Sequence, residues 1–161
     1  MKTGTGARNN GNNPPTTERD EPVKAIITTT IEIDSDQVRD LLVTAFEGGS
    51  NYWYADLEPG RKPTSPDSTD YGSWPAVYPT TGGSVMFADA EDAYHGSDGK
   101  PFVSTDAKGR YVLNATAIKR GFSAMADAYP LRFAQWQTED YDAEDADVFL
   151  QCCIFGEVIY G

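Results

Sequence analysis

The sequence is poor in the residues on which metal and nucleophile chemistry depend. It contains one histidine, His95, and two cysteines, Cys152 and Cys153. A zinc site of cysteine and histidine ligands needs more of them than this chain offers, and we expect no metal and no cofactor. Because the two cysteines are neighbours in an apolar run, their side chains point in different directions, and we expect buried free thiols and no disulfide.

Basic residues are also scarce, with 13 Lys and Arg against 25 Asp and Glu and a formal net charge of −12. This charge argues against a protein that coats nucleic acid or an anionic membrane through a basic face. No apolar run approaches the ~18 residues that span a bilayer, and the first residues lack the pattern of a secretion signal. We therefore expect a small, acidic, soluble protein without a membrane or direct nucleic-acid partner.

Apolar residues are nearly missing from the first 22 positions, where only Met1 and Ala7 are apolar. Such a segment cannot bury enough surface to offset its ordering entropy, so residues 1–22 predict a disordered N-terminal arm. Residues 23–161 are then expected to form one domain. Within this domain, the proline-rich stretch 57–79 predicts a long irregular excursion.

Hydrophobic periodicity predicts the elements of this domain. Strands are expected at 23–33, 84–89, 101–104 and 110–113, with a short last strand at 158–161. Helices are expected from Asp34 to Gly48, from Asn114 to Asp127 and from Asp142 to Phe155, with a short helical or irregular link over 131–137. The last helix is apolar on nearly all sides and should be the most buried element. This order predicts an α+β fold, a small antiparallel sheet with about three helices packed on one face.

The negative charge is concentrated near the C-terminus. Six of the nine residues from 139 to 147 are acidic: Glu139, Asp140, Asp142, Glu144, Asp145 and Asp147. Favourable placement at a helix start accounts for about three of them. Three interpretations stay open for this cluster: a solvated face that aids solubility, a partner-binding surface that mimics a phosphate backbone, and a hard-cation site. The cation site lacks the loop pattern of a calcium-binding hand.

A second candidate binding surface is aromatic. Tyr52, Trp53 and Tyr54 directly follow the first predicted helix, and Tyr71, Trp74 and Tyr78 lie further along the same segment. Tyrosine and tryptophan among Gly and Ser in loops are typical of protein-recognition surfaces. The alternative is that half of these rings pack into the core.

Two glutamates are candidates for catalysis. Glu47 and Glu157 each lie at a helix end beside a glycine and aromatic residues, and His95 is a further candidate. A pair of carboxylates can act as general acid and base when their separation suits the reaction. The alternative is that each glutamate accepts local hydrogen bonds, since the sequence does not place the two close together.

Two motifs stand out in the chain. The first is Glu47-Gly48-Gly49-Ser50-Asn51-Tyr52-Trp53, and the second is the run from Asp142 to Gly161. Together with the stretches 83–89 and 111–121, they resemble a family of small uncharacterised proteins that bacteriophages and prophages encode. The resemblance implies a phage origin and the host cytoplasm, and it assigns no catalytic residue.

The charge asymmetry, the small size and the missing catalytic set predict a non-enzymatic interaction protein. It would bind and modulate a host factor or defence component, or another phage protein, through the acidic cluster and the aromatic segment. One alternative is a small hydrolase or nucleotide-handling protein that uses Glu47 and Glu157. The other alternative is a minor virion structural protein, anchored by its N-terminal arm.

Overall fold

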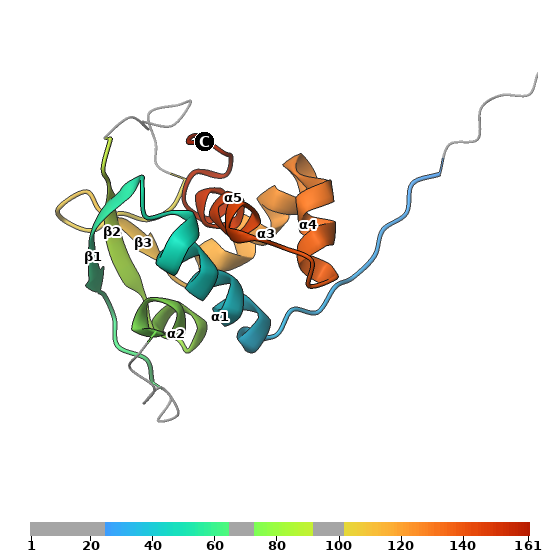
Figure 1. Cartoon of the computed structure of the whole chain (residues 1–161). Helices are drawn as coiled ribbons and strands as arrows, with labels where there is room; N and C mark the ends of the chain where they lie inside the picture. The colour runs from blue at the N-terminus through green and yellow to red at the C-terminus, as the bar shows by residue number, and fades with distance from the viewer. Residues whose placement is uncertain (1–24, 65–72, 92–101) are drawn as a thin grey trace, which may run out of the picture. The chain divides into compact units, whose positions relative to one another are not determined.

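The computed structural model describes residues 25–64, 73–91 and 102–161 (Figure 1). By their contacts, the residues of the chain divide into one unit up to Ile31 and a second unit from Glu32 to Gly161. The predicted arm at 1–22, together with Tyr71 and His95, lies outside the described residues.

Residues 25–34 form neither helix nor strand, so the strand predicted at 23–33 is wrong over its described part. Ile26 and Ile27 are 98% and 86% exposed. The prediction followed from the β-branched residues, which favour extended backbone. A strand also needs a neighbour that completes its backbone hydrogen bonds, and none of the described strands pairs with this segment.

Helices supply most of the regular structure of the second unit. The described helices are α1 (Ser35–Thr44), α2 (Trp74–Thr80), α3 (Ala115–Ala128), α4 (Pro130–Gln137) and α5 (Ala143–Phe155). Helix α1 begins at the predicted capping box, in which the Asp34 carboxylate accepts hydrogen bonds from the backbone N–H groups of Asp36 and Gln37. Asn114 and Asp142 cap α3 and α5 in the same manner, so the three predicted helix starts are confirmed.

Helix α5 is the most buried helix, as predicted, since every residue from Asp145 to Phe155 is buried. Helices α1 and α3 pack against it (Figure 1). A Cβ atom on Gly121 of α3 would lie 2.3 Å from the Cys153 sulfur, so glycine permits this close approach. Cys152 and Cys153 are free and buried, as predicted, and burial raises the pKa of Cys152 to about 12.

The described strands form one antiparallel sheet, in the order β1 (Tyr54–Pro59), β2 (Val85–Asp89), β3 (Tyr111–Leu113). Strands β2 and β3 confirm two of the predicted strands. Figure 1 shows α1, α3 and α5 on one side of this sheet, which confirms the predicted α+β fold, although with more helices than expected. None of the described helices has both the length and the apolar character that crossing a membrane requires.

Three further segments differ from their predictions. The irregular excursion predicted at 57–79 contains regular structure at both ends, because β1 and α2 occupy them. The strand predicted at 101–104 is absent over its described part, 102–104. There the Val112 N–H donates to the Ser104 carbonyl, and Thr105 forms an isolated bridge with Tyr111. The last residues, 158–161, form no strand because their N–H groups bond to side chains instead of a neighbouring backbone.

Candidate functional site

The segment after α1 bends closely around the start of α5. It begins with η1 (Ala45–Gly49), a π-helical turn that contains Glu47, Gly48 and Gly49. The Ser50 N–H donates to the Ala45 carbonyl at 2.8 Å, which is the wide spacing of a π-turn. A Cβ atom on Gly49 would lie 2.4 Å from the carbonyl oxygen of Ala143, so this approach to α5 requires a glycine.

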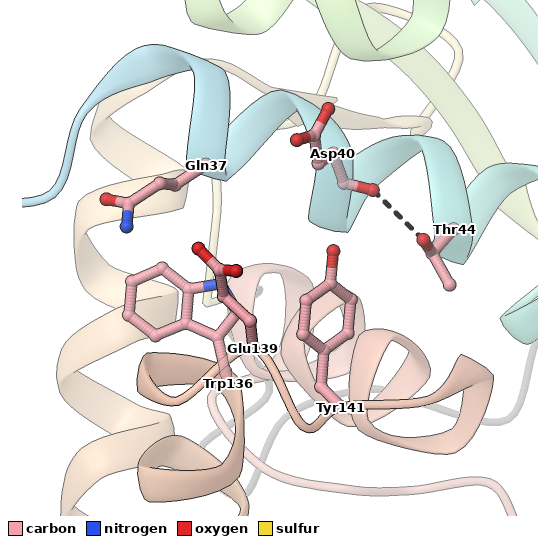
Figure 2. Close-up of a pocket in the computed structure, with 6 residues that line it drawn as sticks. All are labelled: Gln37, Asp40, Thr44, Trp136, Glu139 and Tyr141. Carbon is pink, nitrogen blue, oxygen red and sulfur yellow. Dashed lines mark hydrogen bonds between the residues drawn. The ribbon is translucent and has the colours of Figure 1, made fainter.

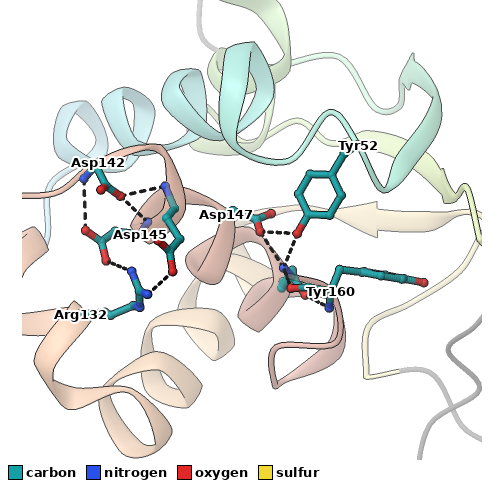
Figure 3. Close-up of polar contacts among 8 residues, drawn as sticks. Tyr52, Arg132, Asp142, Asp145, Asp147 and Tyr160 are labelled. Carbon is teal, nitrogen blue, oxygen red and sulfur yellow. Dashed lines mark hydrogen bonds and ion pairs between the residues drawn. The ribbon is translucent and has the colours of Figure 1, made fainter.

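This bend places three donors around the carboxylate of Asp147, and α5 itself supplies a fourth. Figure 3 shows one of them, the Tyr52 hydroxyl, beside Asp147. Asp147 Oδ1 accepts hydrogen bonds from the Ser50 hydroxyl and the Trp53 indole N–H, both at 2.7 Å. Its Oδ2 accepts from the Tyr52 hydroxyl and the Gln151 amide, both at 2.8 Å. We call these five residues the Asp147 cluster. Asp147 is only 6% exposed, and four donors satisfy its two oxygens in place of water.

Tyr52 lies at the outer edge of the Asp147 cluster. The residue is 51% exposed, but its hydroxyl turns inward to the Asp147 carboxylate. Loss of hydration and the adjoining carboxylate raise the pKa of Tyr52 to about 12. A phenol with this pKa is a poor general acid or base near neutral pH, so its hydroxyl serves as a hydrogen-bond donor.

Gln151 connects the Asp147 cluster to the C-terminal residues. Its Oε1 accepts hydrogen bonds from the N–H groups of Ile159 and Tyr160 at 2.8 Å, and its Nε2 donates to the Tyr160 carbonyl at 3.0 Å. The Tyr160 ring stacks on Trp53 with a centroid distance of 5.8 Å. The two motifs of the sequence therefore meet at one place, where each supplies half of a buried polar network.

A hollow of about 510 Å³ opens beside the Asp147 cluster, between Tyr52, Tyr129 and Arg132. Arg132 is its one lining cation among the described residues, and the guanidinium is already paired. It donates to Asp145 at 2.7 Å and also to Glu144, and these partners raise the pKa of Arg132 (Figure 3). The guanidinium of Arg132 in this hollow is thus already occupied by carboxylates of the same chain.

The structure divides the acidic cluster of the sequence into buried and exposed members. Asp142 caps α5, Asp145 completes the capping box and is 2% exposed, and Asp147 lies in the interior. Glu144 is exposed and pairs with Arg132, whereas Glu139 and Asp140 are exposed in the connection between α4 and α5. No group of three or more acidic, histidine or cysteine side chains suited to a metal ion occurs among the described residues.

The aromatic candidates are similarly divided. Trp53 is fully buried, and Tyr54 is half-buried with its hydroxyl donating to the Phe46 carbonyl at 2.9 Å. Trp74 is half-buried and lies at 5.8 Å from the ring of Tyr78, measured between centroids. Their role in binding a partner stays a prediction, with Tyr52 the most exposed of the four candidates.

The glutamates proposed for catalysis lie apart from any shared cavity in the described part of the chain. Glu47 is exposed and lines a small hollow of about 160 Å³ together with Leu57 and Trp74. Glu157 is exposed in the turn after α5, where Gly156 takes a positive φ of 80°. No hydrogen bond or ion pair of the described residues engages either carboxylate. His95 lies outside the described residues.

A second hollow, of about 440 Å³, lies between α1 and the connection from α4 to α5 (Figure 2). We call it the acidic groove, and its lining residues are Gln37, Asp40, Thr44, Trp136, Glu139 and Tyr141. It has two acidic residues and no basic one in this lining. Sequence reasoning missed the groove because its two sides are far apart in the chain, and only the tertiary fold brings them together.

Glu139 takes an unusual backbone conformation at the edge of this groove. Helix α4 ends in a pair of hydrogen bonds, from the Glu139 N–H to the Trp136 carbonyl and from the Asp140 N–H to the Gln135 carbonyl. This Schellman arrangement places Glu139 at a φ of 58°, a position that glycine normally occupies. A glutamate therefore stands where local backbone energetics favour a residue without a side chain.

Comparison with known proteins identifies no family and no function for this chain. No protein-family model, curated protein or solved structure matches this chain.

Proposed function

We propose that this chain is a non-enzymatic interaction protein that binds a basic host factor or defence component through an acidic face. One observation carries the proposal. Asp40 and Glu139 are exposed and line one groove, and the exposed Asp140 follows Glu139 in the chain. None of these three forms an ion pair with a described Lys or Arg.

Unpaired carboxylates on one face favour association with a basic partner. Like charges that gather on a surface repel one another, so they lower the stability of the free protein slightly and gain from a partner of opposite charge. Such a surface also steers a basic partner into the correct orientation during encounter. The proposal therefore assigns these three residues to binding.

The chemistry of the buried carboxylate supports a binding protein over an enzyme. All four donors around Asp147 belong to the protein, so its oxygens are occupied without a substrate. A general base must have an oxygen within hydrogen-bond reach of the proton that it removes. The Asp147 cluster accordingly acts as a structural core for the surface around it.

The proposal includes a phage or prophage origin, which rests on the resemblance of the two sequence motifs. These motifs build the Asp147 cluster and the C-terminal segment that packs on it. The partner is then expected in the host cytoplasm, where a phage protein of this kind would modulate a host factor.

Two triple variants with the same net charge test the proposal. The first variant, D40N/E139Q/D140N, removes the two acids that line the groove and the adjacent Asp140. The second, E47Q/D127N/E157Q, removes three exposed acids elsewhere. Each changes the formal net charge from −12 to −9. The immobilised proteins are incubated with host lysate, and the retained proteins are compared by mass spectrometry.

We expect a basic partner that the wild type and the second variant retain and the first variant loses. Raised salt should release it, because exposed charges are screened beyond about 10 Å at 0.1 M salt. If both variants retain the partner equally, or both lose it equally, the acids of the groove do not determine binding and the proposal is wrong. Thermal melting of both variants confirms that each is folded.

A further inference from the structure

Residues 25–31 leave apolar side chains and backbone groups open to solvent. Ile26 is 98% exposed, Ile27 is 86% exposed and Ile31 is 41% exposed. No backbone hydrogen bond between described residues involves this segment. Water solvates its N–H and C=O groups in the single chain, so they are available to pair with another strand. Neighbouring apolar residues with this exposure indicate a surface that another molecule covers.

The sequence around these isoleucines has the composition of a strand. From Lys24 to Glu32, six of nine residues are isoleucine or threonine, none is glycine or proline, and the two charged residues are the first and the last. Isoleucine and threonine favour extended backbone, but a strand forms only beside a neighbour that completes its hydrogen bonds. Since none of the described strands pairs with this segment, we look for its neighbour on another molecule.

The edges of the described sheet are poor neighbours for this segment in a second copy of the chain. Strand β1 has a bulge at Asp56 and ends at Pro59, which has no N–H group to donate. Bulges and prolines are features that prevent an edge strand from pairing with other chains. On the outer side of β3, Ser104 accepts from the Val112 N–H and Thr105 forms its isolated bridge. Both edges are thus protected or already paired.

The segment is instead complementary to itself when two copies run antiparallel. With Thr28 of one copy opposite Thr28 of the other, Lys24 lies opposite Glu32 at both ends, and every isoleucine faces a threonine or an alanine. Lys24 directly precedes the described residues and enters this argument through its place in the sequence. A parallel pair in the same register would place like charges side by side, which is unfavourable. The charges therefore favour the antiparallel pair.

We infer that residues 24–32 pair with the same residues of a second copy of this chain, in an antiparallel ribbon with a twofold axis at Thr28. Ile33 packs against the core of the second unit, so the pairing ends where the chain joins that unit. A ribbon of two strands is only marginally stable by itself, and we expect a reversible dimer that forms as the protein concentration rises. The dimer uses no residue of the acidic groove, so it goes beyond the proposed function and is tested independently of it.

Charge reversal tests the pairing on the full chain. Sedimentation velocity measures the fraction of dimer of the wild type over a series of protein concentrations. The variants K24E and E32K each place like charges opposite one another at both ends of the ribbon, and each should weaken the dimer by about tenfold. The double variant K24E/E32K restores the opposite charges and should dimerise like the wild type.

The same variants separate local pairing from overall charge. The formal net charge of −12 becomes −14 in K24E and −10 in E32K, and it stays at −12 in the double variant. An effect of overall repulsion would therefore act in opposite directions in the two single variants. Loss of the dimer in both, with recovery in the double variant, is expected only if these two residues face one another. Thermal melting confirms that each variant is folded.

A cysteine variant tests the register. Since the proposed axis places residue 28 opposite itself, T28C should form a disulfide-linked dimer in the presence of oxidised glutathione. T30C, two residues away on the same face of the strand, lies far from its own copy in this register and should cross-link much less. Cys152 and Cys153 are buried in the interior and do not compete.

Four results would overturn the inference. The wild type stays monomeric over the whole series of concentrations, or the double variant fails to recover the dimer. T30C cross-links as well as T28C does, which contradicts the register. Assemblies larger than a dimer form, which means that the segment adds strands without closing at two copies.

Discussion

Hydrogen-bond donors alone stabilise the buried carboxylate of Asp147. Its two oxygens divide the four donors evenly, with one hydroxyl and one N–H group on each. The hydroxyls of Ser50 and Tyr52 can rotate and become acceptors, whereas the N–H groups of Trp53 and Gln151 can only donate. The Gln151 amide is further fixed because its oxygen accepts two backbone N–H groups.

The variant D147N should therefore be strongly destabilised although it has nearly the same shape. In either orientation, the new NH₂ group faces one donor that cannot turn, Trp53 or Gln151. We expect the free energy of unfolding to fall by about 2–4 kcal/mol, the range for a buried charged network that loses a partner. Urea denaturation measures this change. The control D140N, at an exposed acid nearby, should change stability by less than about 0.5 kcal/mol.

Tyr52 gives the molecule a defined sensitivity to alkaline pH. Its pKa is raised from the ordinary value of 10.0 to about 12 in the folded protein. A raised folded-state pKa contributes stability that is fully present below pH 10 and is lost as the pH rises toward 12. The melting temperature of the wild type should thus fall more steeply over this interval than that of Y52F.

The same variant separates the two effects of the hydroxyl. At neutral pH, Y52F should be less stable than the wild type by about 1–2 kcal/mol, because Asp147 loses one donor. The difference should shrink above pH 10. Parallel melting curves of the two proteins across this interval would show that Tyr52 does not donate to Asp147.

Local chemistry made some residues predictable and left others hidden. The caps Asp34, Asn114 and Asp142 were predictable because each bonds only to residues two or three positions away. Asp147 looked like the other acids of its run, and its interior position depends on the distant Ser50 and Trp53. Its nearest sequence signal was Gln151, one helical turn further along the apolar helix.

At the scale of elements, the approach of η1 to α5 depends on a single glycine. The two adjacent glycines of the turn differ sharply: a Cβ atom on Gly49 would lie 2.4 Å from the Ala143 oxygen, whereas one on Gly48 would have no atom within 4 Å. The pair thus provides a test and its own control.

We expect G49A to lower the free energy of unfolding by about 1–3 kcal/mol, since the clash is with backbone and α5 must shift. The Trp53 and Tyr52 hydrogen bonds to Asp147 should weaken with it. G48A should be neutral or more stable by up to about 1 kcal/mol, because alanine restricts the unfolded chain. Denaturation curves of both variants decide the matter, and similar losses from the two would contradict the described packing.

The helices were easier to predict than the strands for a physical reason. Helix signals such as caps and apolar stripes are local, and α1, α3 and α5 followed them. A strand depends on its neighbour, so the β-branched segment at 23–33 was predicted as a strand although no described strand pairs with it. Conversely, β1 was missed because Asp56, at a positive φ of 53°, interrupts its alternating pattern in a bulge.

At the scale of the whole molecule, the acidic residues behind the net charge of −12 fall into two groups. Some acids stabilise the fold. Asp142 caps α5, Asp145 pairs with Arg132, and Asp147 is buried among hydrogen-bond donors. Others, such as Glu139 and Asp140, are left exposed and without a partner among the described residues. The sequence could locate the charge but could not separate these groups, because the separation depends on which acids α4 and η1 approach.

Glu139 is where the requirements of the fold and of the proposed binding conflict most clearly. Its backbone conformation favours glycine by about 1 kcal/mol, whereas its carboxylate is the charge that the groove offers to a partner. A residue held in a strained conformation is consistent with a role other than stability. The variant E139G removes both the strain and the charge.

The most direct test of the account measures stability and binding on E139G together. We predict that its free energy of unfolding rises by up to about 1 kcal/mol, while the amount of basic partner that it retains from host lysate falls by about fivefold. E139Q should lose the same share of the retained partner without gaining stability. An E139G protein that retains the partner as well as the wild type does would contradict the claim that this groove is a binding site for a basic partner.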